Sequence, residues 1–545
     1  MAHPIRSAFA LVAAAAWLAA APAPATAAPA DIARAPDLTF EPCQARGMPP
    51  FEGTCTVQGF GDFNGDGTDD VVVEQAAAAR APAGADAPVV RTFVLLIGPF
   101  SGSDGPSKRI EVRVEPGEGG VNLTIADVDG DGKDDLALAA LYRDLGGPAL
   151  LGHQRVGLVM GRAALAPRYE LGRLDGATST LRRTIAATSS EAIGQIMLAD
   201  VQAAFGDVNG DGWTDVALGN GIGAALGQAV AIAPARPADD PVTAPATASV
   251  AVAYGPIRWE GATVLTPAVQ ITRLGPCPNA LGGVADVTGD GIDDVVFTQC
   301  PGQRLPDAVQ VLAGSAALAG TVAAAPVGAR GPVAPPRPIL ALGDSEVPPP
   351  GEPGRGYLPG GAAPDPSGRP LFLEDVDADG VRDIVLGFGA NAHVWLGGPD
   401  VGARVAARRT DRVIVGAGFG ALARTRAWHG ADMDGNGVRD VLLVQPLPLP
   451  AAVGRAGADP APGMRGGADP AAGIRARVEI FAGERAAVDV LDTDLDAPDA
   501  VWPSLASLDG MADVDGDGFT DLVWSAPSKA GATLSIHHGP LFGRR

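Results

Sequence analysis

The chain has 545 residues, a formal net charge of −23 at pH 7 and a hydrophobic fraction of 46%. So negative a balance argues against nucleic acid and anionic lipid surfaces as partners, because both carry the same sign of charge. Beyond the N-terminal segment, no run approaches the roughly 18 apolar residues that a membrane-spanning helix needs. We therefore expect no membrane span and no nucleic acid partner.

The first feature in chain order is a leader segment. Arg6 precedes an apolar stretch at 9–21, and small residues with Ala-Thr-Ala at 25–27 follow it. This order of basic, apolar and small residues is typical of a secretory signal peptide. We predict a signal peptide at 1–30 and one mature domain at 31–545, so that the protein is secreted, periplasmic or on the cell surface.

Four cysteines occur in the chain, at Cys43, Cys55, Cys277 and Cys300. In an oxidising compartment an even number predicts two disulfides, for which three pairings are possible. The simplest pairing is local and joins Cys43 to Cys55 and Cys277 to Cys300. The alternative is that the thiols are buried and reduced.

A nine-residue pattern occurs seven times and contains 27 of the 63 acidic residues. Each copy has Asp at position 1, an oxygen-bearing side chain at positions 3 and 5, Gly at position 6 and Asp at position 9. We call the copies loops 1 to 7; they span 62–70, 127–135, 207–215, 286–294, 375–383, 432–440 and 513–521. One copy could be a metal-free Asp/Gly turn, but seven copies with the same acids predict a cation site.

Calcium is the cation that this pattern favours, because it binds six to eight oxygens from carboxylates, amides and backbone carbonyls. Gly at position 6 permits a tight turn, and the carbonyl of residue 7 can then face the ion. The expected side-chain ligands are Asp62, Asn64, Asp66, Asp70; Asp127, Asp129, Asp131, Asp135; Asp207, Asn209, Asp211, Asp215; Asp286, Thr288, Asp290, Asp294; Asp375, Asp377, Asp379, Asp383; Asp432, Asp434, Asn436, Asp440; and Asp513, Asp515, Asp517, Asp521. The expected carbonyl ligands are Thr68, Lys133, Trp213, Ile292, Val381, Val438 and Phe519.

We therefore predict up to seven Ca²⁺ ions, bound with unequal affinity. Thr288 and Asn436 replace carboxylates with neutral oxygens, so loops 4 and 6 should bind more weakly, while loop 2 has the most acid. An EF-hand is excluded, because that loop needs Glu at position 12 and a following helix. Position 12 is apolar in all seven copies.

Position 9 leads directly into a short apolar run of strand type, and a second strand that ends in glycine follows each run. Each loop is therefore expected to join two strands of a hairpin. Successive loops begin between 57 residues (432 − 375) and 89 residues (375 − 286) apart, which is enough for a four-stranded unit. Seven such units predict an all-β protein, a seven-bladed β-propeller with a calcium-binding hairpin loop in each blade.

Other segments fit around this frame. Some repeats continue past the glycine into a further strand, as at 108–114 and 168–174. The last repeat does not, so the segment at 37–43 is predicted to supply the outer strand of the last blade and close the ring. Segments 326–370 and 446–475 are rich in Pro, Gly and Ala and are read as inserts without regular structure.

The loops resemble FG-GAP repeats and the related VCBS-type repeats of the integrin α-subunit propeller and of bacterial secreted proteins. Phe60-Gly61 and Phe205-Gly206 carry the dipeptide that gives the repeat its name, and Ser-Ala-Pro at 525–527 is close to its second element. The resemblance covers about residues 36–545. It implies calcium-stabilised adhesion or protein interaction, and in some members enzymatic activity.

No catalytic residues stand out, since no nucleophile elbow, phosphate-binding loop or paired-cysteine metal motif occurs. His537 and His538 are adjacent and should point to opposite faces of a strand. Trp213 is expected to pack against a neighbouring blade, with a sugar-stacking surface as the alternative. The function most favoured is a secreted calcium-binding module for an extracellular or cell-envelope protein or glycan. A polysaccharide-active enzyme and a calcium-stabilised scaffold without a specific ligand are the alternatives.

Overall fold

The structure is a computed structural model, and the elements in its described part are all β-strands. The described residues are 30–31, 36–43, 53–77, 90–100, 105–144, 151–186, 201–220, 249–272, 274, 281–299, 308–324, 339–342, 371–375, 379–388, 391–399, 401, 412–415, 433, 440–446, 476–481, 490–492, 500–505, 508–528 and 531–540. The signal peptide predicted at 1–30 lies outside them except for Ala30.

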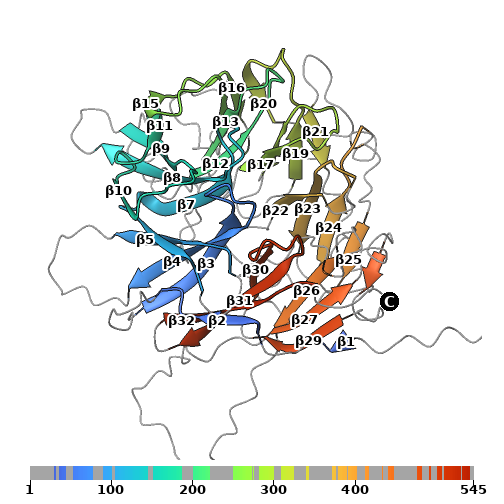
Figure 1. The fold of residues 1–545 in the computed structure, drawn as a ribbon. Coiled ribbons are helices and arrows are strands. Elements are labelled where there is room, and N and C mark those ends of the chain that lie inside the picture. Colours follow the sequence, from blue (N-terminus) through green and yellow to red (C-terminus); the bar gives the residue numbers. More distant parts are fainter. Residues whose placement is uncertain are drawn as a thin grey trace, which may run out of the picture.

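The described strands form seven sheets of four or five strands, which follow one another around a ring in chain order (Figure 1). We number the sheets as blades 1 to 7, after the loop that each contains. The fold is thus a β-propeller, as the spacing of the loops predicted.

In blades 1 to 5 and 7 an antiparallel hairpin encloses the loop, and two further strands complete the meander; the described part of blade 6 begins with the strand that follows its loop. Blades 1 to 3 contain β3 (Gly53–Gly61), β4 (Asp70–Ala77), β5 (Arg91–Ile97), β6 (Lys108–Val114); β7 (Glu118–Ala126), β8 (Asp135–Asp144), β9 (Leu151–Val159), β11 (Ser179–Ala186); and β12 (Val201–Gly206), β13 (Asp215–Asn220), β14 (Ser249–Ala253), β16 (Val269–Thr272).

Blades 4 and 5 repeat this order, and blade 6 repeats it from the strand after its loop. They contain β17 (Leu281–Ala285), β18 (Asp294–Gln299), β19 (Ala308–Leu312), β21 (Ile339–Leu342); β22 (Leu371–Glu374), β23 (Asp383–Phe388), β24 (Asn391–Trp395), β25 (Arg412–Val415); and β26 (Val441–Pro446), β27 (Ala476–Phe481), β29 (Ala500–Leu505). The prediction that 326–370 is an insert without regular structure is wrong at β21, which lies inside it. Its four apolar residues pair with β19, so that part of the segment is the outer strand of blade 4.

Blade 7 combines both ends of the described chain. It contains β30 (Leu508–Ala512), β31 (Asp521–Ser528), β32 (Gly531–His537) and β2 (Leu38–Phe40). β2 pairs antiparallel with β32, with Leu38 opposite Ile536. The predicted closing strand at 37–43 is therefore confirmed.

A fifth strand is added to several blades by the following repeat. β10 (Arg168–Gly172), β15 (Gly261–Val264), β20 (Gly320–Ala323) and β28 (Val490–Asp492) each pair parallel with the outer strand of the preceding blade. β1 (Ala30–Asp31) pairs with β29 in the same way, just before β2 closes blade 7. The segment at 168–174 is thus a strand as expected, but it lies on the edge of blade 1 and not within its own blade.

The hydrophobic core lies between adjacent blades. One cluster joins blades 1 and 2 and another joins blades 7 and 1. The residue at position 2 of each described loop enters the cluster shared with the next blade, and its side chain is almost fully buried. These residues are Phe63, Val128, Val208, Val287 and Val514. The loops are therefore anchored by the same contacts that hold the blades together.

Candidate metal-binding loops

The first aspartate of loops 1, 2, 4 and 7 holds the backbone of its own loop in a turn around its carboxylate. In loop 1, the carboxylate of Asp62 accepts backbone N–H groups from Gly65 at 2.7 Å, Asp66 at 3.1 Å and Gly67 at 2.7 Å. The aspartates at position 1 of loops 2, 4 and 7 accept the same three N–H groups. This local bonding holds the loop in one shape and directs the side chains at positions 3 and 5 toward the same side.

Glycine at position 6 is required by the backbone. Its φ angle is +82° in Gly132 and +85° in Gly518, a left-handed conformation that residues with a Cβ rarely adopt. A Cβ at either position would meet no atom within 4 Å, so space is not the constraint.

The aspartate at position 9 is a buried clamp between two strands. Asp135, 1% exposed, accepts the N–H of Val128 at 3.0 Å and the N–H of Gly161 at 2.6 Å. Gly161 is the glycine that follows β9. The same pair of bonds is made by Asp70, Asp215, Asp294 and Asp521, and Asp383 makes the bond to its glycine.

That glycine is constrained by a close approach of backbone. A Cβ on Gly539 would lie 2.7 Å from the carbonyl oxygen of Thr520, and one on Gly397 would lie 2.5 Å from that of Arg382. Only glycine lets the strand end come near enough for its N–H to reach the clamp. The glycine that was read from the sequence as a strand end is thus part of the loop's architecture.

Burial of the clamp carboxylates raises their pKa values. Burial is the largest cause in each, and it raises the pKa of Asp70 and Asp135 to about 7 and that of Asp215, Asp294 and Asp521 to about 6. The backbone N–H donors act in the opposite direction, and neighbouring aspartates raise the pKa further for Asp70, Asp135, Asp215 and Asp521. A cation beside these groups would favour their charged form.

Position 8 links the loops of consecutive blades. The carboxylate of Asp134 in loop 2 accepts the N–H of Asp62 at 2.9 Å, and its own N–H donates to the carbonyl of Asp62 at 2.9 Å. Asp293 makes the same two bonds to Asp207. Asp69 makes them to Asp513, which joins loop 1 to loop 7 across the closure of the ring.

The loops fit a calcium ion by donor type and by spacing. In loop 2, Asp127, Asp129 and Asp135 each offer an oxygen, and these atoms lie within 4.8 Å of one another. In loop 7, Asp513, Asp515 and Asp517 do the same. Such sets of converging carboxylates suit a hard cation that takes oxygen ligands. Loops 1 and 3 differ, since Asn64 and Asn209 at position 3 donate from Nδ2 to the acid at position 5.

The structure places the predicted ligands of loops 1 to 4 and 7 in one recurrent geometry. Asp377, Asp432, Asp434, Asn436 and Val438 lie outside the described residues. The N–H of residue 7 donates to the acid at position 5, as from Thr68 to Asp66 at 3.0 Å. Calcium itself stays a prediction.

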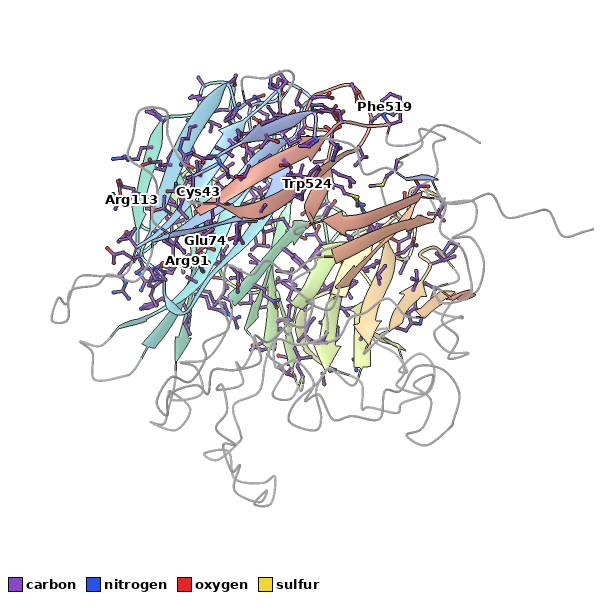
Figure 2. All side chains as sticks on the ribbon, turned by 90° about the horizontal axis from the view of Figure 1, so that it is seen from below. Cys43, Glu74, Arg91, Arg113, Phe519 and Trp524 are labelled. Atoms are coloured by element: carbon purple, nitrogen blue, oxygen red, sulfur yellow. A yellow bond between two sulfur atoms is a disulfide. The ribbon has the colours of Figure 1, made fainter. Side chains whose placement is uncertain are left out.

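Two side chains at position 7 behave unlike the others. Trp213 is 57% exposed, so the expected packing against a neighbouring blade is wrong. Ile292 and Val381 each cover the glycine at position 4 of the preceding loop. For Trp213 this glycine is Gly130, and no atom lies within 4 Å of a Cβ built there. Phe519 is also exposed, and Figure 2 shows it at the edge of the molecule.

The sequence placed His538 in a strand but did not connect it with the acids of loop 7. His537 is fully buried and stacks on Trp524 with ring centroids 4.3 Å apart, whereas the next side chain, His538, faces the loop acids. The two do point to opposite sides, as predicted. The overlooked signal was position: His538 directly precedes the glycine bound by the clamp.

A disulfide joins Cys43 and Cys55, as the local pairing predicted. It connects the segment after β2 of blade 7 with β3 of blade 1, and so adds a covalent link at the closure of the ring. Cys277 and Cys300 lie outside the described residues.

A cavity of about 660 Å³ opens among the inner strands of blades 1 to 5. Its polar side chains are largely engaged in bonds between blades: Asn122 donates to the carbonyl of Val201 at 2.8 Å, and Thr124 donates to that of Ala203 at 2.9 Å. We therefore assign these groups to the joining of inner strands.

Residues 509–533 match the FG-GAP repeat family. The match covers loop 7 and its two strands, so the resemblance drawn from the sequence is confirmed there. The sequence matches no curated protein.

The chain is similar in structure to a rhamnogalacturonan lyase of Bacillus licheniformis, with a TM-score of 0.39 and 12% identity over 92% of this chain and 76% of the lyase. The rhamnogalacturonan lyase YesW gives a TM-score of 0.37 and 13% identity over 91% and 76%. A V. cholerae biofilm matrix protein, Bap1, gives 0.24 and 11% over 93% and 91%. Likenesses this low carry no argument about ligand or activity here.

Within the described residues, no helix has the length and apolar character to cross a bilayer.

Proposed function

We propose that the protein is an extracytoplasmic calcium-binding propeller that serves as a binding module for a protein or a glycan. The observation that carries the calcium assignment is the convergence of carboxylates in loops 2 and 7, held in place by backbone N–H groups. The Cys43–Cys55 disulfide supports a location outside the reducing cytoplasm.

Calcium would act here as a structural counter-ion. In loop 2 the residues that would hold it are Asp127, Asp129, Asp131 and Asp135, and in loop 7 they are the matching four aspartates. Bound calcium supplies positive charge to these acids and joins the loop to its buried clamp. Because position 8 connects one loop to the next, each filled site also steadies a neighbouring blade.

Trp213 favours a glycan as the ligand. An exposed indole on a fixed loop is costly to leave in water, and its flat face suits the apolar side of a sugar ring. Trp213 belongs to loop 3, which is next in the ring to loop 2, the most acidic of the seven loops. A calcium ion in such a loop could also accept sugar hydroxyls as ligands, since calcium binds neutral oxygens.

The test is retention of the mature protein on glycans and cell-envelope extract in millimolar calcium, followed by elution with EDTA. We expect a ligand that EDTA releases and that the Trp213→Ala variant fails to retain, with Phe519→Ala as the matched control on another loop. Calcium titration of both variants should match the wild type. Retention of no ligand would support the scaffold alternative, and cleavage of a polysaccharide panel would replace the proposal with an enzyme.

A further inference from the structure

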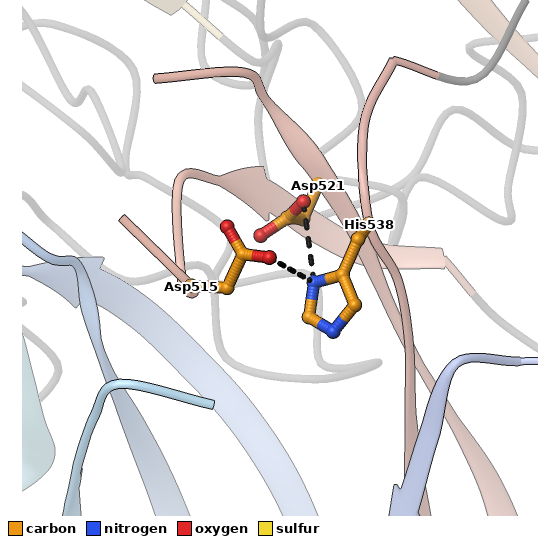
Figure 3. Close-up of side chains that lie close together, drawn as sticks. All are labelled: Asp515, Asp521 and His538. Atoms are coloured by element: carbon orange, nitrogen blue, oxygen red, sulfur yellow. Dashed lines mark ion pairs between the residues drawn. The ribbon is translucent and has the colours of Figure 1, made fainter. Parts of the chain in front are cut away.

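His538 belongs to the acidic cluster of loop 7 although it lies outside the nine-residue pattern. Its Nδ1 is 3.1 Å from Oδ2 of Asp515 and 3.5 Å from Oδ1 of Asp521 (Figure 3). Asp515 is at position 3 of the loop, and Asp521 is the fully buried clamp at position 9. The histidine comes from the end of β32, the strand that pairs with β31.

Loop 7 therefore contains two overlapping triads. Asp513, Asp515 and Asp517 form a set with oxygen ligands alone, while Asp515, Asp521 and His538 form a second set with one nitrogen. In each set the ligand atoms lie within 4.8 Å of one another, and Asp515 belongs to both. Loop 2 has an oxygen triad only, at Asp127, Asp129 and Asp135.

The spacing around Nδ1 suits a small ion. Zinc binds nitrogen and oxygen at about 2.0–2.2 Å in tetrahedral geometry, which places ligand atoms roughly 3.3–3.6 Å apart. The two distances from Nδ1 of His538, 3.1 and 3.5 Å, are close to that range. Nδ1 of His538 thus faces oxygens of both Asp515 and Asp521, and one metal ion placed between them would bind all three atoms.

The nitrogen is particular to blade 7 among the described blades. The residue before the clamp-bound glycine is Ile97 in blade 1, Met160 in blade 2, Tyr254 in blade 3, Ala313 in blade 4 and Leu396 in blade 5. None of these offers the imidazole that zinc, copper and nickel prefer and calcium does not.

We propose that Asp515, Asp521 and His538 bind a first-row transition ion of the zinc class, at a site that overlaps loop 7 and differs from the calcium sites in its nitrogen ligand. Three protein ligands leave a fourth position for water or for an atom of a ligand. Because Asp515 and Asp521 are also expected calcium ligands of loop 7, the ion competes with calcium for loop 7 alone. The proposal does not depend on the function suggested for Trp213 or on calcium binding by the other loops.

The test is titration of the mature protein with Co²⁺, whose visible absorption reports coordination, and with Zn²⁺ as competitor, both in millimolar calcium. We expect one Co²⁺ site that Zn²⁺ displaces, and a loss of at least about tenfold in affinity for both ions in His538→Leu. Leucine is the residue that blade 5 has at this position, so the variant keeps every carboxylate. Its melting temperature in calcium should match the wild type.

A second variant tests the proposal by creating a new metal site, so that the test does not rest only on the loss of affinity in His538→Leu. Met160→His places an imidazole at the corresponding position of blade 2, before the glycine bound by Asp135. It should add a second Co²⁺ site to the wild-type protein. The proposal is overturned if His538→Leu binds Co²⁺ and Zn²⁺ as tightly as the wild type, or if the wild type binds neither ion in calcium.

Discussion

Loop 2 and loop 7 share aspartates at positions 1, 3, 5 and 9 and the same backbone bonds, yet they differ in the basic side chain beside these acids. In loop 2, Lys133 at position 7 extends its ammonium to within 2.7 Å of Asp131. In loop 7 the corresponding residue is Phe519, and the basic group is His538 from the end of β32. The nine-residue pattern therefore fixes the shape of a loop, whereas its neighbours in the sheet set the chemistry.

Removal of calcium should have the largest effect on both loops. An extracellular calcium module binds at about 10⁻⁴–10⁻³ M, and a site at ten times its Kd adds about 1.4 kcal/mol of stability. Summed over the loops, chelation by EGTA should lower the melting temperature by about 10 °C or more. Calorimetry with and without calcium measures this, and magnesium serves as the control. An unchanged melting temperature would refute a structural role for calcium.

Loss of a clamp should be the next largest effect and should be equal in the two loops. Asp135→Ala and Asp521→Ala each leave two buried N–H groups without an acceptor. Each such group costs about 1–3 kcal/mol. Urea unfolding should show both variants destabilised by similar amounts, in calcium-free buffer as well. In calcium-free buffer the exposed Asp131→Ala is the matched control, and a clamp variant as stable as this control there would contradict the assignment.

The clamps also predict how the calcium-free protein responds to pH. Burial raises the pKa of Asp135 from 3.8 to about 7 and that of Asp521 to about 6, so the folded state holds more protons than the unfolded state between these values. Stability must then fall as pH rises from about 4 to about 7. Melting temperatures in EGTA should decline over this range, and saturating calcium should reduce the decline. A rise in stability over the same range without calcium would contradict the burial cost.

Much of this fold was accessible from the sequence because the loops repeat. The hairpins, the seven blades and the closing strand at Leu38–Phe40 follow from a loop pattern that recurs seven times and from the apolar runs beside it. The strands exchanged between blades could not be predicted, since β10 resembles any short amphipathic segment until its partner is known. β21 was not predicted for the same reason, because its four apolar residues lie within a Pro- and Gly-rich stretch and the sequence does not show that they pair with β19.

The site was predicted in part, for a similar reason. Residues that act within their own loop, at positions 1, 3, 5, 6 and 9, stand out through repetition. Position 8 acts on the neighbouring blade, and its residue is Asp, Thr or Arg in different loops. Asp134 reaches Asp62 past Gly61, where a Cβ would lie 2.7 Å from the Asp134 carboxylate. In blades 1 and 3 the glycine of the Phe-Gly dipeptide thus leaves room for an aspartate of the next blade, which a single repeat does not reveal.

The smallest expected effect concerns position 7, which is Lys133 in loop 2 and Phe519 in loop 7. The Lys133 ammonium pairs with Asp131, so it competes with a calcium ion for one of the ligands of loop 2. Lys133→Ile copies the residue that loop 4 has at position 7 and should raise the calcium affinity of loop 2 by no more than about fivefold, because exposed ion pairs are weak. Arg113→Ala, which removes an exposed cation of β6, is the control for net charge. Calcium titration at low ionic strength measures the difference. If both variants bind calcium equally, the lysine acts only through the overall charge, and loop 2 owes its affinity to its acids alone.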